Sequence, residues 1–361
     1  MSTEEKLVLV TGANGFVAMQ CIVQLLQEGY RVRGTLRSLD RANDIKATVG
    51  KHADVSSGRL SFVAADLARD EGWKEAAAGC SYVLHVASPV PRNAPKHPDD
   101  VILPARDGTL RVLKAAAAAG VKRVVMTSST SSVLYGHKRD GSETYDEHHW
   151  TKLTSDVAPY DQSKTIAERA AWDFVKGLKD SERFEFVVMN PGLVLGPALS
   201  DNTSVSGEVV RKLLTREMPG CPNLGWAAVD VRDVAAAHIT ALTHPRAPGQ
   251  RFILAIEHAS MHQIAEILAQ HFGPQGFKVP TRRVPNWVLR LVGVWDKTAR
   301  MVVPELGKRQ DVSSTRARTI LNWKPRNLET MVVDMAESMI KLGIVNAPGG
   351  RASAAAATES V

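Results

Sequence analysis

Residues 7–18 read LVLVTGANGFVA, two apolar runs separated by a turn that contains two glycines. The first run predicts a buried strand over Leu7–Thr11, and the second predicts a helix. Gly12 permits a tight turn, and Gly15 lets the backbone approach a pyrophosphate at the amino end of that helix. Such a turn between the first strand and the first helix predicts dinucleotide binding, with a merely structural turn as the alternative. The candidate binding residues here are Gly12, Asn14, Gly15, Phe16 and Val17.

The alternation of strand and helix continues through the first half of the chain. The apolar runs are nearly continuous, as in strands that are buried on both faces of a parallel sheet. The sequence therefore predicts an α/β fold, a Rossmann-type doubly wound parallel sheet with a ligand crevice at the carboxyl ends of its strands. The further predicted strands are Arg31–Leu36, Leu60–Ala65, Tyr82–Ala87, Arg123–Ser128 and Phe184–Asn190, and the predicted helices are Ala18–Glu28, Trp73–Ala78 and Pro104–Ala119.

The alternation breaks down after about Gly196, where shorter segments carry Pro and Gly. We expect a cofactor-binding domain over residues 1–195 and a smaller C-terminal substrate lobe over residues 196–345. Part of the lobe should return to the main domain, because Val231–Ala241 reads as a helix with Asp230 as its N-cap. Residues 346–361 are rich in Pro, Gly, Ala and Ser and predict a disordered tail.

Composition argues against several classes of protein. The net charge of +7 comes from dispersed basic residues and aromatic residues make up 6% of the chain, so nucleic-acid binding is not expected. The polar start and the lack of long apolar runs predict neither an export signal nor a membrane span. Cys21, Cys80 and Cys221 are far apart, which favours free thiols over a disulfide frame or a metal site. We expect a cytoplasmic protein, monomeric or homodimeric.

The segment after the second predicted strand indicates which dinucleotide binds. NAD-dependent enzymes place an acidic residue there to hold the ribose hydroxyls. In this chain the strand runs into Arg37, and Arg41 follows one helical turn later. Two guanidinium groups suit a 2′-phosphate, so the pattern favours NADPH/NADP+. The alternative is that Arg37 is a surface residue and Asp40 is a helix N-cap.

Tyr160 and Lys164 are four residues apart near the start of a predicted helix that continues to Lys176. This spacing places both on one helix face, with Cβ atoms about 5 to 6 Å apart. We expect the ammonium to bring the tyrosine pKa closer to neutrality, so that the phenol can donate a proton to a developing alkoxide. Ser129 ends the fifth strand, where the crevice is expected, and can polarise a carbonyl. By itself the tyrosine–lysine spacing is common by chance.

Several separated motifs occur together in the chain, in a fixed order. They are Thr11–Phe16, Asp66-Leu67, His85–Pro89, Thr127–Ser129, Tyr160–Lys164, Asn190–Gly192 and Val229–Val234. With these motifs the chain resembles the extended short-chain dehydrogenases/reductases, in the branch of the dihydroflavonol 4-reductases and yeast-type aldehyde (methylglyoxal) reductases. The resemblance runs from about Lys6 to Leu342.

The resemblance implies an NADPH-dependent carbonyl reductase that turns an aldehyde or ketone into an alcohol. It assigns proton donation to Tyr160, polarisation of the carbonyl to Ser129, and contact with the nicotinamide ribose to Lys164. It also implies further cofactor contacts. These are Asp66 and Leu67 at the adenine, Ala87 and Ser88 along the pyrophosphate and ribose, and Pro191 and Val194 at the nicotinamide carboxamide.

The chain departs from several members of this superfamily. Residues 155–160 lack the Asn-Trp-Tyr-Cys stretch of cinnamoyl-CoA reductases, which disfavours a CoA thioester. Serines follow Thr127 where sugar-nucleotide dehydratases carry Asp-Glu, which disfavours elimination. Residues 133–135 lack the asparagine with which flavonoid reductases bind a phenolic ring. An epimerase, a steroid or alcohol dehydrogenase, and a non-catalytic NADPH-sensing module remain as alternatives.

Two other features have simpler explanations than a functional site. His258 and His262 are four residues apart, but Ser260 with Gln263 fits a helix capping box, so no metal site is expected. The apolar run Trp287–Trp295 fits a lid or a core helix, with a partner-binding helix as the alternative.

Overall fold

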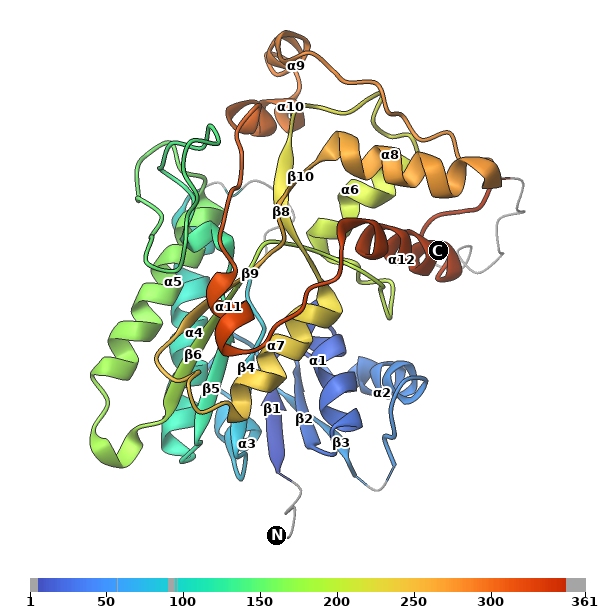
Figure 1. Ribbon diagram of the computed structural model, residues 1–361. Helices are drawn as coiled ribbons and strands as arrows, with labels where there is room; N and C mark the ends of the chain where they lie inside the picture. The colour runs from blue at the N-terminus through green and yellow to red at the C-terminus, as the bar shows by residue number, and fades with distance from the viewer. Residues whose placement is uncertain (1–5, 57, 90–94, 96, 349–361) are drawn as a thin grey trace.

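The computed structural model describes residues 6–56, 58–89, 95 and 97–348. Its centre is a seven-stranded sheet of parallel neighbours in the order β3-β2-β1-β4-β5-β6-β9 (Figure 1). The order runs outward from β1 in both directions, so the predicted doubly wound fold is confirmed. The strands are β1 (Leu7–Val10), β2 (Arg31–Leu36), β3 (Leu60–Ala64), β4 (Tyr82–His85), β5 (Arg123–Thr127), β6 (Glu185–Pro191) and β9 (Arg251–Leu254).

Helices cover both faces of this sheet. One face carries α1 (Phe16–Gln27), α2 (Ala42–Gly50) and α7 (Val231–Thr243), and the other carries α3 (Trp73–Ala77), α4 (Asp99–Ala118) and α5 (Pro159–Lys176). Val8 and Val10 belong to the apolar core on the first face, whereas Leu9 belongs to the core on the second. A strand with a core on each side needs apolar residues at every position, which explains the unbroken run at residues 7–10.

The predicted amino end is wrong for the helix α4 and right for the helix α7. The helix α4 begins at Asp99 rather than at Pro104, which lies inside it. Two acidic residues in its first turn favour that start, and the helix continues through the proline in its second turn, which lacks an N–H to donate. The helix α7 begins as predicted after Asp230, whose carboxylate accepts a hydrogen bond from the Arg232 amide at 2.8 Å.

A second, three-stranded sheet adjoins the carboxyl edge of the main one, in the order β10-β8-β7. It consists of β7 (Leu193–Leu195), β8 (Gly225–Asp230) and β10 (His258–Ser260), and the helices nearby are α6 (Ser204–Leu214), α8 (Met261–Phe272) and α12 (Leu328–Lys341). These three helices pack on one another. Between β8 and β10 the chain returns to the main sheet, where α7 packs against α1 and β9 pairs with β6.

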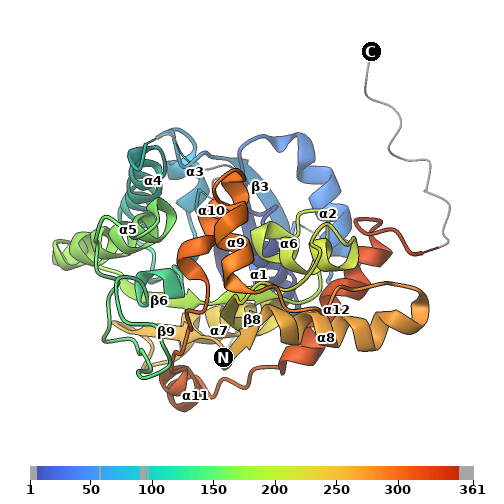
Figure 2. The ribbon, with the colours of Figure 1, turned by 90° about the horizontal axis from the view of Figure 1, so that it is seen from above.

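Short elements lie across the middle of the molecule above the carboxyl edge of the main sheet (Figure 2). They are α9 (Asn286–Val292) and α10 (Lys297–Val302), and η5 (Val303–Glu305) follows α10 in the chain. The other short elements are α11 (Thr315–Ile320), η3 (Asp180–Glu182) and η4 (Gly273–Gln275). Trp287 and Trp295 are 67% and 74% exposed, so the expectation of core packing for this apolar run is wrong. The reason is that α9 packs mainly on α10 and η5, which are too small to cover it.

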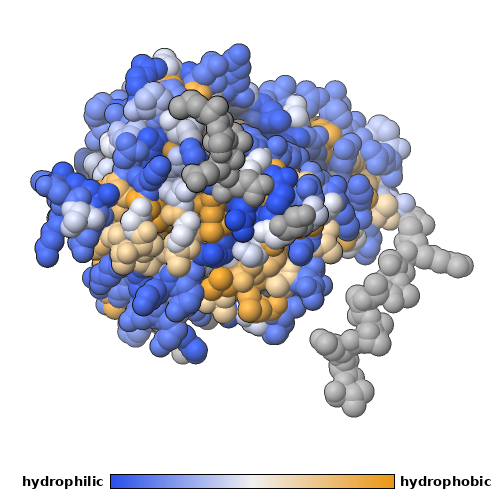
Figure 3. Space-filling model, turned by 90° about the horizontal axis from the view of Figure 1, so that it is seen from below, coloured by the Kyte–Doolittle hydropathy of each residue, from blue (hydrophilic) through white to orange (hydrophobic). Residues whose placement is uncertain are grey.

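Three further observations bear on the expected class of protein. Within residues 6–56, 58–89, 95 and 97–348, no helix is both long and apolar enough to cross a membrane. Cys21, Cys80 and Cys221 are buried free thiols, as predicted. The face seen from below is largely hydrophilic around an apolar central area (Figure 3). Most of the predicted tail, residues 349–361, lies outside the described residues.

Candidate active site

The turn between β1 and α1 requires both of its glycines. Gly12 has a φ of +68°, which L side chains rarely adopt, and a Cβ there would lie 3.0 Å from the Cβ of Ala87. A Cβ on Gly15 would lie 3.1 Å from the carbonyl oxygen of Gly12. The turn and the segment after β4 therefore approach each other closely at the carboxyl edge of the sheet.

Hydroxyl side chains hold this turn in place. The Gly12 amide donates to Thr35 Oγ1 at 3.0 Å, and the Ala87 amide donates to Thr11 Oγ1 at 2.9 Å. Thr11 Oγ1 also lies 3.0 Å from Nδ1 of His85, and burial lowers the pKa of that imidazole to about 3. The two threonines were not among the predicted site residues, although hydroxyl side chains near the carboxyl ends of adjacent strands could have indicated that they hold the turn.

The amino end of α1 offers free hydrogen-bond donors. Gly15 is the N-cap and provides no side-chain acceptor, and the first turn holds no acidic residue. The N–H groups there attract anions, so the glycine turn and the amino end of α1 fit the pyrophosphate of a dinucleotide. Asn14 and Val17 are partly exposed beside this end, whereas Phe16 is buried.

Arg37 and Arg41 both lie exposed after β2, where a 2′-phosphate was expected. Arg37 follows the strand directly, and Arg41 ends the single turn η1 (Leu39–Arg41). Ser38 rather than Asp40 caps that turn, since its Oγ accepts from the Asp40 amide at 3.3 Å. The alternative is therefore wrong about Asp40 as a cap, whereas Arg37 does lie at the surface, as that alternative also expects.

A segment after β7 contacts Arg41 and the glycine turn. The guanidinium of Arg41 lies 3.7 Å from the Asp201 carboxylate, and the Asn202 side-chain amide donates to the Asn14 carbonyl at 2.9 Å. These residues line one small pocket with Ser200 and α2. The sequence offered no signal for this contact, because more than 150 residues separate the partners in the chain.

The other predicted cofactor residues lie at the same edge, with one exception. Asp66 and Leu67 follow β3, Ala87 and Ser88 follow β4, and Pro191 ends β6. Pro191 is buried, and the four others are partly exposed. Val194 instead lies in β7 of the second sheet and is 8% exposed, so most of its surface packs in the core.

Ser129 follows β5 and is the N-cap of the single turn η2 (Thr130–Ser132). Its Oγ accepts a hydrogen bond from the Ser131 amide at 3.1 Å, which leaves its own proton available to a substrate. Ser128, by contrast, is 3% exposed and donates to Glu168 at 2.5 Å. Of these two serines, the partly exposed Ser129 is the one placed to meet a ligand.

Tyr160 and Lys164 lie one turn apart at the start of α5, as their spacing predicts. The Lys164 ammonium is 5.6 Å from the centre of the Tyr160 ring. The turn η2 packs on α5. This contact brings the end of β5, with Ser129, to the first turn of the helix that carries Tyr160.

The expected influence of Lys164 on Tyr160 is wrong for this arrangement. Burial and the charge of Asp161 raise the pKa of Tyr160 above its ordinary value. Burial lowers the pKa of Lys164 to about 8, although the charge of Glu168 opposes the shift. Tyr160 therefore keeps its proton at neutral pH, the form that donates to an oxyanion.

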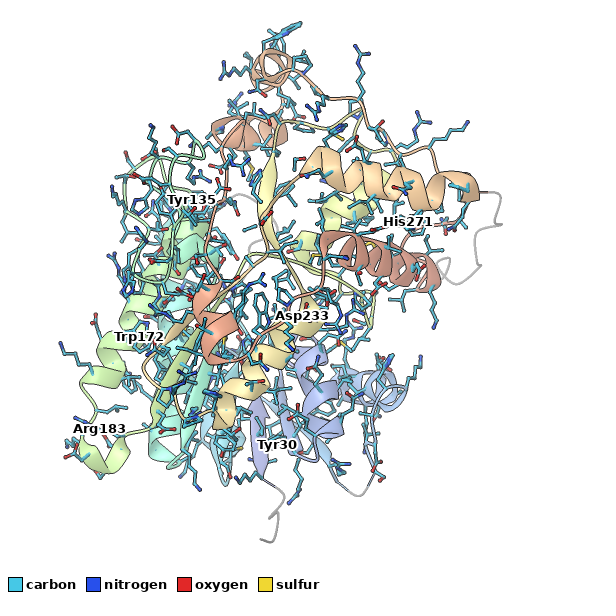
Figure 4. All side chains as sticks on the ribbon, viewed as in Figure 1. Tyr30, Tyr135, Trp172, Arg183, Asp233 and His271 are labelled. Carbon is cyan, nitrogen blue, oxygen red and sulfur yellow. The ribbon has the colours of Figure 1, made fainter. Side chains whose placement is uncertain are left out.

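Tyr135 is a second tyrosine near this site that was not predicted as a site residue. It lies on the loop at the upper end of α5 (Figure 4). The guanidinium of Arg139 is 4.4 Å from its ring centre. Burial raises its pKa, as do the charges of Asp161 and Glu305. A neutral phenol thus lies beside the first turn of α5, in the loop region where sequence patterns are least informative.

His258 lies in β10 and His262 in the first turn of α8. Ser260 and Gln263 form the predicted capping box at its amino end, with Ser260 Oγ accepting from the Gln263 amide at 3.2 Å. Within the part of the chain that the structure describes, no group of three or more His, Cys, Asp or Glu side chains is arranged to hold a metal ion.

The doubly wound sheet, the glycine turn and the uncapped end of α1 together define a Rossmann-type dinucleotide-binding protein. The catalytic-type side chains gather at the same carboxyl edge. The chain belongs to the NAD dependent epimerase/dehydratase family, whose model matches residues 8–256.

Reductases are prominent among the similar proteins. The NADPH-dependent methylglyoxal reductase GRE2 of Saccharomyces cerevisiae is 31% identical over 350 residues, which cover 92% of this chain and 98% of that protein. Cinnamoyl-CoA reductase 1 of Arabidopsis thaliana is 39% identical over 280 residues, 77% of each chain. The crystal structure of yeast methylglyoxal/isovaleraldehyde reductase Gre2 complexed with NADPH matches with a TM-score of 0.77 at 28% identity, over 93% of this chain and 98% of that one. The resemblance drawn from the motifs is confirmed.

Proposed function

We propose that this protein is an NADPH-dependent reductase that converts an aldehyde or a ketone to an alcohol. The observation that carries the proposal is that Ser129 and the start of α5, with Tyr160 and Lys164, lie at the sheet edge that holds the dinucleotide turn. Bound NADPH supplies the hydride that reduces the carbonyl carbon. Tyr160 donates its proton to the carbonyl oxygen, and Ser129 donates a hydrogen bond that stabilises the charge developing there.

Other residues bind the cofactor and prepare the acid. The glycine turn and the amino end of α1 hold the pyrophosphate, and Arg37 and Arg41 bind the 2′-phosphate. Lys164 bonds the nicotinamide ribose, and its charge stabilises the phenolate once Tyr160 has lost its proton. The remaining contacts are Asp66, Leu67, Ala87, Ser88 and Pro191, whereas Val194, also expected from the sequence, lies in β7 and packs mostly in the core.

Similarity supports both the cofactor and the reaction. The yeast relative that shares almost its full length with this chain is named an NADPH-dependent methylglyoxal reductase, and the matching crystal structure contains NADPH. Residues 1–195 then form the cofactor domain, and residues 196–345 supply the lobe that selects the substrate. We place the protein in the cytoplasm, a reducing compartment that suits its buried free thiols.

The variant Tyr160→Phe tests the assignment of the acid. Without the phenolic proton, kcat for aldehyde reduction should fall by about 10²- to 10⁴-fold. The dissociation constant for NADPH, measured by fluorescence titration, should stay within about twofold, because the ring remains in place. Stopped-flow and steady-state NADPH oxidation measure the rate. Activity near that of the parent protein would contradict the proposal.

A CoA thioester is the second candidate substrate, and the 39% identity to a cinnamoyl-CoA reductase favours it. The missing Asn-Trp-Tyr-Cys stretch at residues 155–160 argues against it. A panel of aldehydes, ketones and aromatic CoA thioesters, run with NADPH and NADH side by side, separates the two. Reduction of the thioester at a kcat/KM above that of the aldehydes would replace the first candidate by the second.

A further inference from the structure

A buried ion pair lies beneath the proposed catalytic residues. Glu168 on α5 and Arg251 at the start of β9 are joined at 2.6 Å between Oε1 and Nε, and their side chains are 0% and 7% exposed. Charges this deep are stable only when every lone pair and proton finds a partner. The partners of this pair therefore show what it holds together.

The second carboxylate oxygen of Glu168, Oε2, accepts hydrogen bonds from three side chains, two in the segment after β5 and one in β6. Ser128 Oγ donates at 2.5 Å, Ser132 Oγ at 2.6 Å and Asn190 Nδ2 at 2.8 Å. Ser128 follows the end of β5 directly, Ser132 ends the turn η2 after it, and Asn190 lies near the end of β6. A single carboxylate thus ties α5 to the carboxyl ends of two central strands.

Two of these donors also hold the backbone of Ser129. Its carbonyl oxygen accepts from Asn190 Nδ2 at 3.2 Å, and the single proton of Ser132 Oγ, which lies 2.8 Å away, is shared between this oxygen and Glu168. The Ser132 amide donates to the same oxygen at 3.0 Å. The peptide that carries the Ser129 hydroxyl is therefore held by groups that are themselves held by Glu168.

Arg251 extends the same network to the loop before α5. Its Nη1 donates to the carbonyl oxygens of Glu147 and His149 at 2.9 and 2.8 Å, and Nη2 donates to Ser132 Oγ at 3.1 Å. The guanidinium also stacks 3.8 Å from the ring centre of Trp150. The planar fork of arginine suits this set of acceptors, which lysine could not serve in the same way.

We infer that the Glu168–Arg251 pair is a positioning unit for the reaction proposed above. The pair fixes the peptide of Ser129 relative to α5. On this helix, Glu168 lies one turn after Lys164 and two turns after Tyr160. Neither residue touches the substrate. The pair acts by keeping the hydrogen-bond donor and the proton donor aimed at one carbonyl oxygen, since small misplacements of such groups slow the chemical step strongly. The inference rests on the proposed function.

The variant Glu168→Gln tests this role because it keeps the shape and removes the charge. We expect kcat to fall about tenfold, with the dissociation constant for NADPH within about twofold of the parent. We also expect the primary isotope effect, measured with each C4-deuterated NADPH, to rise as hydride transfer becomes slower relative to product release. A loss of stability alone would not move that isotope effect in folded protein.

A milder variant and a matched control complete the experiment. Ser132→Ala keeps the ion pair but removes the link to the Ser129 carbonyl, and we expect kcat to fall about fivefold with NADPH binding unchanged. Glu185→Gln removes a carboxylate that pairs with Arg123 at 2.5 Å at the opposite ends of β5 and β6. This control should leave kcat and the isotope effect within about twofold.

The outcomes separate the inference from the function on which it rests. If Glu168→Gln does not fold, Ser132→Ala decides alone. Folded variants that keep the parent kcat and isotope effect overturn the inference, as does an equal loss in Glu185→Gln. A parent protein that reduces no carbonyl compound contradicts the proposed function, and the positioning role falls with it.

Discussion

Arg41 is the residue whose partner should change when the cofactor binds. In the structure its guanidinium lies 3.7 Å from the carboxylate of Asp201, and both groups are more than half exposed. An ion pair this exposed to water contributes little stability. A phosphate group offers the guanidinium a stronger, bidentate acceptor, so NADPH should displace Asp201 from Arg41.

Arg37→Ala and Arg41→Ala should therefore each raise the KM for NADPH by about tenfold and leave the KM for NADH within about twofold. The reason is that each variant removes a group that only the 2′-phosphate uses. Steady-state kinetics with both cofactors measure the ratio. Lys46→Ala, an exposed change on α2, serves as the control. An equal increase for both cofactors would argue against 2′-phosphate recognition.

At the scale of the element, the turn from β1 into α1 combines two constraints that glycine alone satisfies. Gly12 has a positive φ, and a Cβ at this position would also be crowded by Ala87. Gly29, at the other end of α1, has a φ of +89°, but a Cβ added there would meet open space among the described residues. The two glycines therefore share backbone strain and differ in crowding.

Gly29→Ala should cost about 1 kcal/mol of unfolding free energy and leave NADPH binding within about twofold, because only backbone strain is added. Gly12→Ala should cost at least as much and weaken NADPH binding by more than about tenfold, because the turn must also move away from Ala87. Urea denaturation and fluorescence titration measure the two effects. Equal losses of binding in both variants would contradict the assigned role of Gly12.

At the scale of the whole molecule, one ion pair connects the loop beside Tyr160 with the segment that carries α9 and α10. Arg139 donates to both carboxylate oxygens of Glu305, at 2.8 and 2.7 Å, and its side chain is 3% exposed. The Arg309 amide also donates to the Arg139 carbonyl at 2.8 Å. These contacts join residues more than 160 positions apart in the chain.

Glu305→Ala should lower the unfolding free energy by about 2 kcal/mol, since it leaves the Arg139 charge buried without its partner. Hydrogen exchange should increase in residues 286–313 before the main sheet opens. Lys308→Ala removes only a half-exposed ammonium 3.9 Å from the same carboxylate, and its effect should stay below about 0.5 kcal/mol. Similar losses in both variants would show that the buried pair does not stabilise this segment.

The elements of the fold could be predicted closely where a core covers the chain on both sides. The predicted bounds Arg31–Leu36 agree with β2 at both ends, because β-branched and apolar residues there are followed at once by polar ones. The start of α4 could not be predicted from Pro104, since the acidic first turn at Asp99 determines it. Of the two expectations for the run Trp287–Trp295, a lid or a core helix, the core helix is wrong, because a local pattern does not show whether a partner element is large enough to cover the run.

By itself the sequence determined the doubly wound sheet, the glycine turn and the placement of Tyr160 and Lys164 on one helix face. These features depend on residue spacing within single elements and on apolar runs, which local patterns record. Only the tertiary structure decided that burial raises the pKa of Tyr160, that Arg41 meets Asp201, and that Glu168 with Arg251 holds the peptide of Ser129. Those properties arise from contacts between distant segments and from exclusion of water, and neither is encoded in the spacing of neighbouring residues.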